Sequence, residues 1–132
     1  MLVADTSALV SALADPVLAT RLRRRLAEDE QLEAPHLVDL EFLQGLRRLV
    51  RLGKVSEDRA MDIRFDFGQL RLTRYGHEPL ADRIWELRDN LSAYDASFVA
   101  LAELLEAPLV TCDAALASAP GVEAEIELFV VG

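Results

Sequence analysis

The stretch Leu2-Val3-Ala4-Asp5-Thr6-Ser7 places a short apolar run directly before an acid, and Leu109-Val110-Thr111-Cys112-Asp113 repeats that arrangement near the other end. Each run is short and continuous, as expected of a strand that is buried on both faces of a sheet. Between them, amphipathic segments of helical periodicity alternate with further short apolar runs, which favours an α/β fold. The two stretches therefore predict two strands of a sheet, each ending at a carboxylate.

The other elements follow from periodicity, helix caps and turn residues. Helices are expected over residues 6–14, 16–30, 37–52, from Ser56 onward, 79–90 and 93–106, and strands over residues 2–4, 32–34, 70–73, 109–112 and 126–131. Crossovers that carry helices imply a mostly parallel, five-stranded sheet with helices on both faces. No repeat, linker or low-complexity tract divides the chain, so residues 1–132 are expected to form a single domain.

The composition is that of a globular protein, with 52% hydrophobic and 28% charged residues among 132. The single cysteine, Cys112, excludes both an intramolecular disulfide and a cysteine-based zinc site, which fits a reducing, cytoplasmic location. We expect no signal peptide and no membrane contact, because the N-terminus lacks a basic region and no run of about 18 apolar residues exists.

The net charge of −9 opposes binding to nucleic acid, because phosphates repel an acidic protein. Bound cations and clustered arginines would offset this repulsion. Two arginine clusters on predicted helices are candidates for contacting RNA phosphates, namely Arg21, Arg24 and Arg25, and Arg47, Arg48 and Arg51. The competing interpretation is two solvated helix faces with ion pairs to neighbouring acids, among them Glu28, Asp29 and Glu57.

Asp5 and Asp113 stand at the carboxyl ends of their strands. In open α/β sheets, sites form outside these ends, where the strand order reverses. If the two strands are neighbours, the two carboxylates face each other and repel. A hard divalent cation is the simplest reason for that arrangement.

Two further acids have equally plausible structural roles. Glu41 lies one turn into the predicted helix 37–52, where a solvated Glu also stabilises the helix start. Asp95 follows Ser92 at the spacing of a capping box, so it could serve only as a cap. From the residues alone, both remain candidates for either a metal site or a purely structural role.

Four stretches resemble the PIN-domain nucleases, and most of all the VapC toxins of bacterial toxin–antitoxin pairs. They are Val3–Leu9 (VADTSAL), Pro35 with Leu40-Glu41, Leu91–Ala96 (LSAYDA) and Leu109–Asp113 (LVTCD). The stretches occur in the family's order and at its typical spacing along the whole chain. The resemblance implies a PIN-like three-layer sandwich.

The resemblance also implies a divalent-metal-dependent endoribonuclease in which Asp5, Glu41, Asp95 and Asp113 hold Mg²⁺ or Mn²⁺. An all-oxygen site suits these cations better than zinc. The metal would activate a water molecule for attack on the RNA phosphodiester. Accessory hydroxyls are expected from Thr6 or Ser7 and from Thr111. The family further implies a homodimer and a small VapB-like antitoxin as partner.

One feature departs from the family pattern. Some relatives carry a further acid shortly after the last one, whereas Ala114, Ala115 and Leu116 follow Asp113 here. The number of bound metal ions, one or two, is therefore left open. The sequence also leaves open which RNA is cut and which antitoxin binds.

Other acid-bearing α/β families fit less well. A haloacid-dehalogenase phosphatase needs a second acid two residues after the first, where Ser7 stands. A response-regulator receiver needs a lysine late in the sheet, but the one lysine, Lys54, follows a helix. No GxGxxG motif marks a dinucleotide site. The alternative that remains is a catalytically silent PIN-like interaction module whose acids bind a cation for structure alone.

Overall fold

The computed structural model describes residues 1–131. Its centre is a five-stranded sheet in the order β3-β2-β1-β4-β5, and every neighbouring pair is parallel. The strands are β1 Leu2–Ala4, β2 Leu32–Pro35, β3 Leu72–Tyr75, β4 Leu109–Thr111 and β5 Ile126–Leu128. The predicted fold class is confirmed, and the sheet is parallel throughout rather than mostly so.

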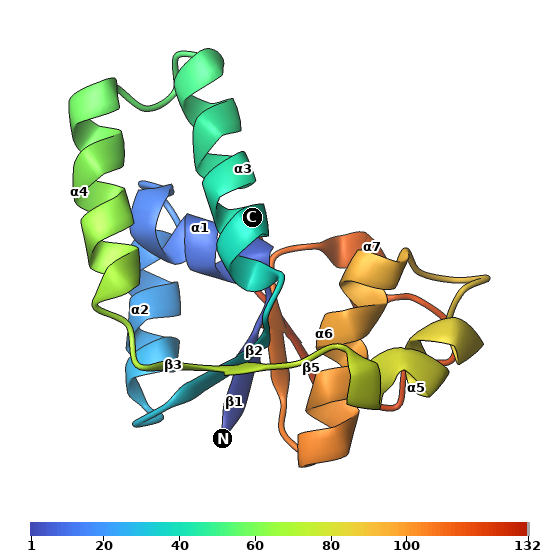
Figure 1. Cartoon of the computed structure of the whole chain (residues 1–132). Helices are drawn as coiled ribbons and strands as arrows, with labels where there is room; N and C mark the ends of the chain where they lie inside the picture. Colours follow the sequence, from blue (N-terminus) through green and yellow to red (C-terminus); the bar gives the residue numbers. More distant parts are fainter. Residues whose placement is uncertain (132) are drawn as a thin grey trace.

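Helices cover both faces of this sheet (Figure 1). They are α1 Thr6–Ala14, α2 Ala19–Ala27, α3 Val38–Arg51, α4 Glu57–Gly68, the 3₁₀ helix η1 Glu78–Leu80, α5 Ala81–Glu86, α6 Ala93–Leu105 and α7 Ala114–Ala117. Helices α1 to α4 lie on one side, and α5 and α6 lie on the other. The α3–α4 hairpin projects beyond the carboxyl ends of the strands. This arrangement is the three-layer sandwich that the sequence predicts.

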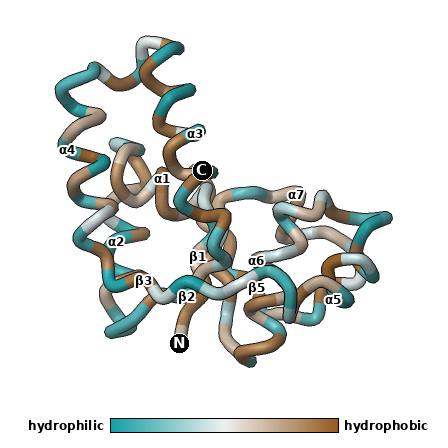
Figure 2. The backbone as a smooth tube through the Cα atoms, in the orientation of Figure 1, coloured by the Kyte–Doolittle hydropathy of each residue, from teal (hydrophilic) through white to brown (hydrophobic). Residues whose placement is uncertain are grey.

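The core forms where β1 and α6 meet. All three residues of β1 are fully buried, because β1 is the central strand. Helix α6 is buried from Ala96 to Ala102 and packs against β1, β2 and β4. Figure 2 shows the hydrophobic colouring of this central region. No helix within residues 1–131 has both the length and the apolar character needed to cross a membrane.

Three predicted helix starts are confirmed by their caps. The side chain of Asp5 accepts a hydrogen bond from the Ala8 amide at the start of α1. Ser56 caps α4, and Ser92 caps α6 through its hydroxyl. Each satisfies one of the amides that a helix start leaves without a partner. Because Asp5 ends β1 as well as capping α1, its carboxylate is fixed at the edge of the sheet.

Several predicted boundaries are wrong. Helix α2 begins at Ala19 rather than at Pro16, because Asp15 accepts bonds from the amides of Val17 and Leu18 and holds that segment as a turn. Strand β3 begins at Leu72 rather than at residue 70, since Leu70 is still bonded back to the end of α4.

The predicted helix 79–90 and the last strand are also shorter in the structure. The helix divides into η1 and α5 and ends at Glu86, where the amide of Leu87 bonds to several carbonyls of the last turn. Strand β5 ends at Leu128 and not at residue 131. The short helix α7, which Asp113 caps, has no counterpart in the prediction.

Gly45 lies where α3 crosses α1. A Cβ added at Gly45 would stand 3.3 Å from Cγ2 of Val10 on α1. That distance is tighter than an ordinary contact, so the absence of a side chain allows the two helices to approach this closely.

Candidate functional site

Asp5 is held at the junction of β1, β4 and α1. Its amide donates to the carbonyl of Val110 on β4. Its Oδ1 accepts from the Ala8 amide at 2.9 Å and from the Ser7 hydroxyl at 2.6 Å, and its Oδ2 accepts from the Thr111 hydroxyl. The residue is only 5% exposed. β1 and β4 are neighbours, so the condition under which the sequence places Asp5 and Asp113 at the same edge is met.

Glu41 reaches the same edge from α3. Its Oε1 accepts a hydrogen bond of 2.7 Å from the hydroxyl of Thr6. Thr6 is the first residue of α1, so this bond ties α3 to the start of α1. Glu41 therefore points into the molecule and is not a solvated residue of the first helical turn.

Asp95 and Asp113 both stand at helix starts. The amide of Asp95 donates to the Ser92 hydroxyl at 3.1 Å. Asp113 caps α7, and its Oδ1 accepts from the amides of Ala115 at 2.9 Å and Leu116 at 3.3 Å. In a parallel sheet, helices that follow strands begin at the carboxyl edge. Asp113 is therefore brought to the edge that carries Asp5, and Asp95, whose helix follows α5, lines the same cavity as Asp5.

A single cavity of about 230 Å³ brings the four predicted acids together. Its lining consists of Asp5, Thr6, Ser7, Glu41, Gln44, Asp95, Phe98 and Asp113. No basic side chain contributes to this lining. The four carboxylates thus share a concave surface that contains no compensating positive charge from the described part of the chain.

The electrostatics of the cavity follow from this composition. Burial raises the pKa of Asp5, although hydrogen bonds from Ser7, Thr111 and the Ala8 amide oppose the rise. Burial likewise raises the pKa of Glu41 and of Asp95, and carboxylate repulsion adds to it, from Asp95 on Glu41 and from Asp113 on Asp95. A nearby cation would relieve both the burial cost and the repulsion.

The donor chemistry fits a hard divalent cation, because carboxylate and hydroxyl oxygens surround the cavity and neither thiol nor imidazole does. The carboxylates do not already form a closed metal centre. Within residues 1–131, no three Asp, Glu, His or Cys side chains stand in an arrangement that holds a metal ion. The carboxylates of Asp5, Glu41 and Asp113 are instead held separately by hydroxyls or backbone amides.

The predicted accessory hydroxyls lie beside the acids. Ser7 donates to Asp5 and accepts from the Cys112 amide at 2.9 Å, so it bridges the ends of β1 and β4. Thr111 donates to Asp5 and accepts from the amide of Asp113 at 3.0 Å. The hydroxyls therefore orient the carboxylates and join the two strands.

Two further residues line the cavity beside the predicted acids. Gln44 lies one turn after Glu41 on α3, and Phe98 lies one turn after Asp95 on α6. The helical spacing i, i+3 places such pairs on one face. That spacing is the signal that would have found both.

The predicted RNA-binding arginines fall into two environments. Arg25 is bound in ion pairs, at 2.7 Å to Glu127 and at 3.2 Å to Glu28 and to Asp29. Arg21 lies over the ring of Phe129, with 5.4 Å to its centroid, and Arg24 is exposed beside it on α2. This cluster fits the structural interpretation that the sequence left open.

The second cluster lies on α3, the helix that carries Glu41. Arg47 and Arg48 are exposed, and neither occurs among the ion pairs of residues 1–131. RNA contact by either arginine cluster stays a prediction.

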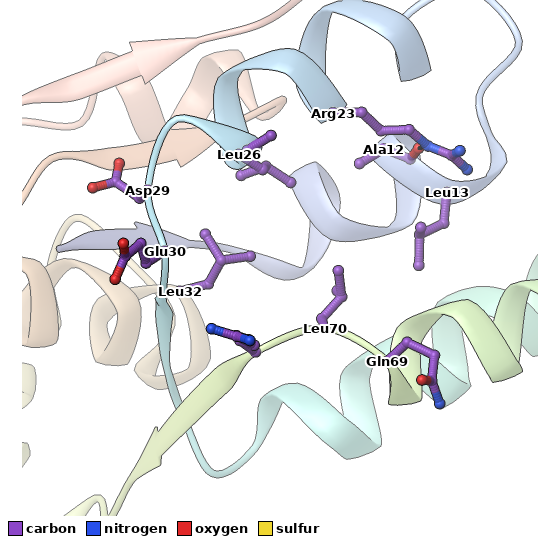
Figure 3. Close-up of a pocket in the computed structure, with 11 residues that line it drawn as sticks. Ala12, Leu13, Arg23, Leu26, Asp29, Glu30, Leu32, Gln69 and Leu70 are labelled. Atoms are coloured by element: carbon purple, nitrogen blue, oxygen red, sulfur yellow. Dashed lines mark hydrogen bonds between the residues drawn. The ribbon is translucent and has the colours of Figure 1, made fainter.

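Another cavity, of about 240 Å³, lies near the amino ends of β2 and β3. Figure 3 shows Leu26, Leu32 and Leu70 around it, with Asp29 and Glu30 at one side. Arg23, which also lines this cavity, donates at 2.7 Å to the carbonyl of Ala12 and so ties α2 to α1. This cavity lacks the converging acids of the carboxyl edge.

Comparison with known proteins agrees with this geometry. A model of the PIN domain matches residues 2–122. The VapC ribonuclease Mb0985 of Mycobacterium bovis is 48% identical over 116 residues, which cover 86% of each chain. Ribonuclease VapC1 of Mycobacterium tuberculosis is 41% identical over 127 residues, 96% of each chain. The structure of VapBC2 from Rickettsia felis bound to a DNA fragment from their promoter has a TM-score of 0.68 at 17% identity, over 97% of this chain and 98% of the other.

The chain therefore belongs to the PIN-domain family. Its relatives within that family are VapC ribonucleases, which confirms the resemblance drawn from the sequence.

Proposed function

We propose that this chain is a divalent-metal-dependent endoribonuclease and the toxin of a VapBC-type pair. The observation that carries the proposal is the convergence of four carboxylates on one cavity without a basic partner. The curated relatives named as VapC ribonucleases support the ribonuclease activity and the toxin role. Binding of Mg²⁺ or Mn²⁺ is our inference from the all-oxygen lining.

Asp5, Glu41, Asp95 and Asp113, which line one cavity, would hold the cation. When bound, it would supply a nucleophilic water at neutral pH and neutralise charge on the phosphate. The chain's own residues prepare the site. Ser7 and Thr111 fix both oxygens of Asp5, and Thr6 fixes Glu41. Phe98, which is 1% exposed, gives the cavity an apolar wall.

Two partners belong to the proposal. A VapB-like antitoxin is proposed from the names of the relatives, and an acidic toxin with a net charge of −9 suits a partner that carries basic residues. A homodimer is proposed as the working state, and its mass in solution would test that point.

The decisive experiment measures cleavage of a structured RNA pool by the purified chain. Cleavage should require Mg²⁺ or Mn²⁺, stop on addition of chelator and return with either cation but not with zinc. The products should carry 5′-phosphate and 3′-hydroxyl ends, because the water would attack the phosphorus in line with the 3′-oxygen and the bond between phosphorus and that oxygen would break. Undiminished cleavage in excess chelator would overturn the metal mechanism.

A second measurement does not depend on activity. A cation that binds only the folded chain should raise the free energy of unfolding by about 2.7 kcal/mol at 100 times its dissociation constant. The Asp5→Asn variant should show a smaller rise. A chain that is stabilised by Mn²⁺ yet cleaves no RNA in any pool would instead be the silent interaction module.

A further inference from the structure

An open hollow adjoins the acid cavity along α3. It measures about 550 Å³, which lies within the range of small-molecule sites. Glu41 and Gln44 line both spaces, so the hollow is continuous with the acid cavity. Its apolar wall includes Leu40 and Leu43, and Leu40 is 75% exposed.

Tyr94 provides an aromatic face on the other side of this hollow. Its side chain is 65% exposed, although it directly precedes Asp95 at the start of α6. No aromatic ring within residues 1–131 pairs with it. An exposed ring between apolar side chains can receive a flat, unpaired base by stacking.

Arg47 gives the hollow a positive charge. It lies one turn after Leu43 on α3, and among residues 1–131 the arginines in ion pairs are Arg25, Arg74 and Arg83. Its guanidinium is thus the basic group in the lining of the hollow, which is continuous with the acid cavity. A phosphodiester chain that enters the cavity needs such a cation at its flank.

We propose that this hollow binds one unpaired nucleotide of the RNA next to the scissile phosphate. Tyr94 stacks on its base, Gln44 contacts the base edge, and Arg47 binds the adjoining phosphate. The inference rests on the proposed ribonuclease function and adds to it the side chains that hold a nucleotide beside the cut. The continuity with the acid cavity and the arginine favour a nucleotide over a second protein copy, which would have to bury Gln44 and Arg47 against itself.

The test uses two probes, a 12-nucleotide oligouridylate and a base-free ribose-phosphate chain of the same length. Binding is measured by fluorescence anisotropy in Mg²⁺, in an Asp113→Asn background that prevents cleavage. Tyr94→Ala should weaken oligouridylate binding by roughly five- to a hundredfold and leave the base-free chain unaffected. Tyr94→Phe should restore binding, because the aromatic face remains.

Arg47→Met should weaken both probes and reduce the slope of log K against log salt by about 0.7, the value for one single-strand phosphate contact. Trp85→Ala and Arg64→Met are matched controls. Trp85 is 67% exposed but lies on α5, and Arg64 is an exposed arginine on α4 that does not line the hollow. Both controls should bind both probes as the parent does.

The outcomes separate this inference from the proposed function. If the parent binds and the wild type cleaves RNA, but Tyr94→Ala and Arg47→Met match their controls, the subsite is disproved and the ribonuclease stands. A change of mass in solution on Tyr94→Ala would make the hollow an interface between copies and overturn the subsite. If the wild type neither binds nor cleaves RNA, both proposals fail together.

Discussion

The carboxylates of the cavity and the carboxylate of Glu103, which pairs α6 with α5, lie in opposite electrostatic environments. Glu103 on α6 lies 2.7 Å from the guanidinium of Arg83 and also accepts from the Glu123 amide at 2.8 Å. Burial alone would raise the pKa of Glu103, but these bonds hold it below its ordinary value. The buried carboxylate of Asp5 receives only hydroxyls and an amide, and its pKa is raised.

This difference distinguishes acids that stabilise the fold through an ion pair from acids whose charge is available to bind a ligand. Thirteen arginines are available in the chain, and Glu103 and Glu127 each have one at 2.7 Å. The cavity lining has none. Neutral donors orient a carboxylate without cancelling its charge, so the charge remains free to bind a cation.

The largest contrast is expected in cleavage. Asp5→Asn should lower the cleavage rate by about 10²–10³-fold, the usual loss when one preorganised electrostatic group is removed. The amide keeps an oxygen for the Ala8 amide, so the variant should stay folded. Initial rates at saturating Mn²⁺ give the measurement. Glu103→Gln is the control and should cleave at close to the wild-type rate; comparable losses in both variants would erase the distinction between the two regions.

For the free energy of unfolding, the larger loss is expected from Glu103→Gln and the smaller from Asp5→Asn. Glu103→Gln should cost about 1–3 kcal/mol, because the charge-assisted bonds to Arg83 are lost in a half-buried setting. Urea unfolding in chelator measures it. Asp5→Asn should cost less than Glu103→Gln, since the amide also removes a buried and repelled charge. A larger loss in Asp5→Asn would assign Asp5 a structural role.

A smaller effect distinguishes the cap of α6 from its acid. Ser92→Ala should cost about 1 kcal/mol of stability through the lost bond to the Asp95 amide, with much of the cleavage retained. Asp95→Asn should keep most of the fold and lose nearly all cleavage. Thermal melting and the RNA assay on both variants provide the test. Near wild-type cleavage by Asp95→Asn would reduce the site to Asp5, Glu41 and Asp113.

The smallest effect concerns pH. Because folding raises the pKa of Asp5, the folded chain binds this proton before the unfolded chain does. The contribution of Asp5 to stability should therefore increase as the pH falls from neutral towards about 4, the ordinary value of Asp. The contribution of Glu103 has the opposite sign, because folding lowers its pKa. Urea unfolding in chelator across this range should show that, as the pH falls, the free energy of unfolding of the wild type rises relative to that of Asp5→Asn. A difference between the two proteins that stays constant with pH would contradict the raised pKa.

The sequence predicted the sheet and the positions of Asp5 and Asp113 well, because both follow from local patterns. A strand that ends at an acid carries that acid to the carboxyl edge wherever parallel pairing occurs. The placement of Glu41 is different, because it depends on how α3 lies against α1. Residues alone left its role open, and only the family resemblance assigned it.

Long-range packing and local bonding can each override propensity. Glu33 illustrates the first case, because a charged residue is unusual in a buried strand, yet the predicted strand over residues 32–34 is confirmed. The structure buries Glu33 at 2% exposure within β2, and its Oε2 has no hydrogen-bond partner among residues 1–131. Asp15 illustrates the second case, because the same side chain that caps helices here stabilises a turn instead.

The close approach of α3 to α1 at Gly45 affects the electrostatics of the cavity, because these two helices position two of its acids. Glu41 lies one turn before Gly45 on α3, and Asp5 caps α1, which carries Val10. A methyl group at position 45 would force Val10 or the whole helix to move by a few tenths of an ångström. Because Coulomb energy varies inversely with distance, such a movement would change the interaction of Glu41 with the other carboxylates and with any shared cation. The absence of a side chain at Gly45 thus sets the distance between the carboxylates of Glu41 and Asp5, although Gly45 touches neither of them.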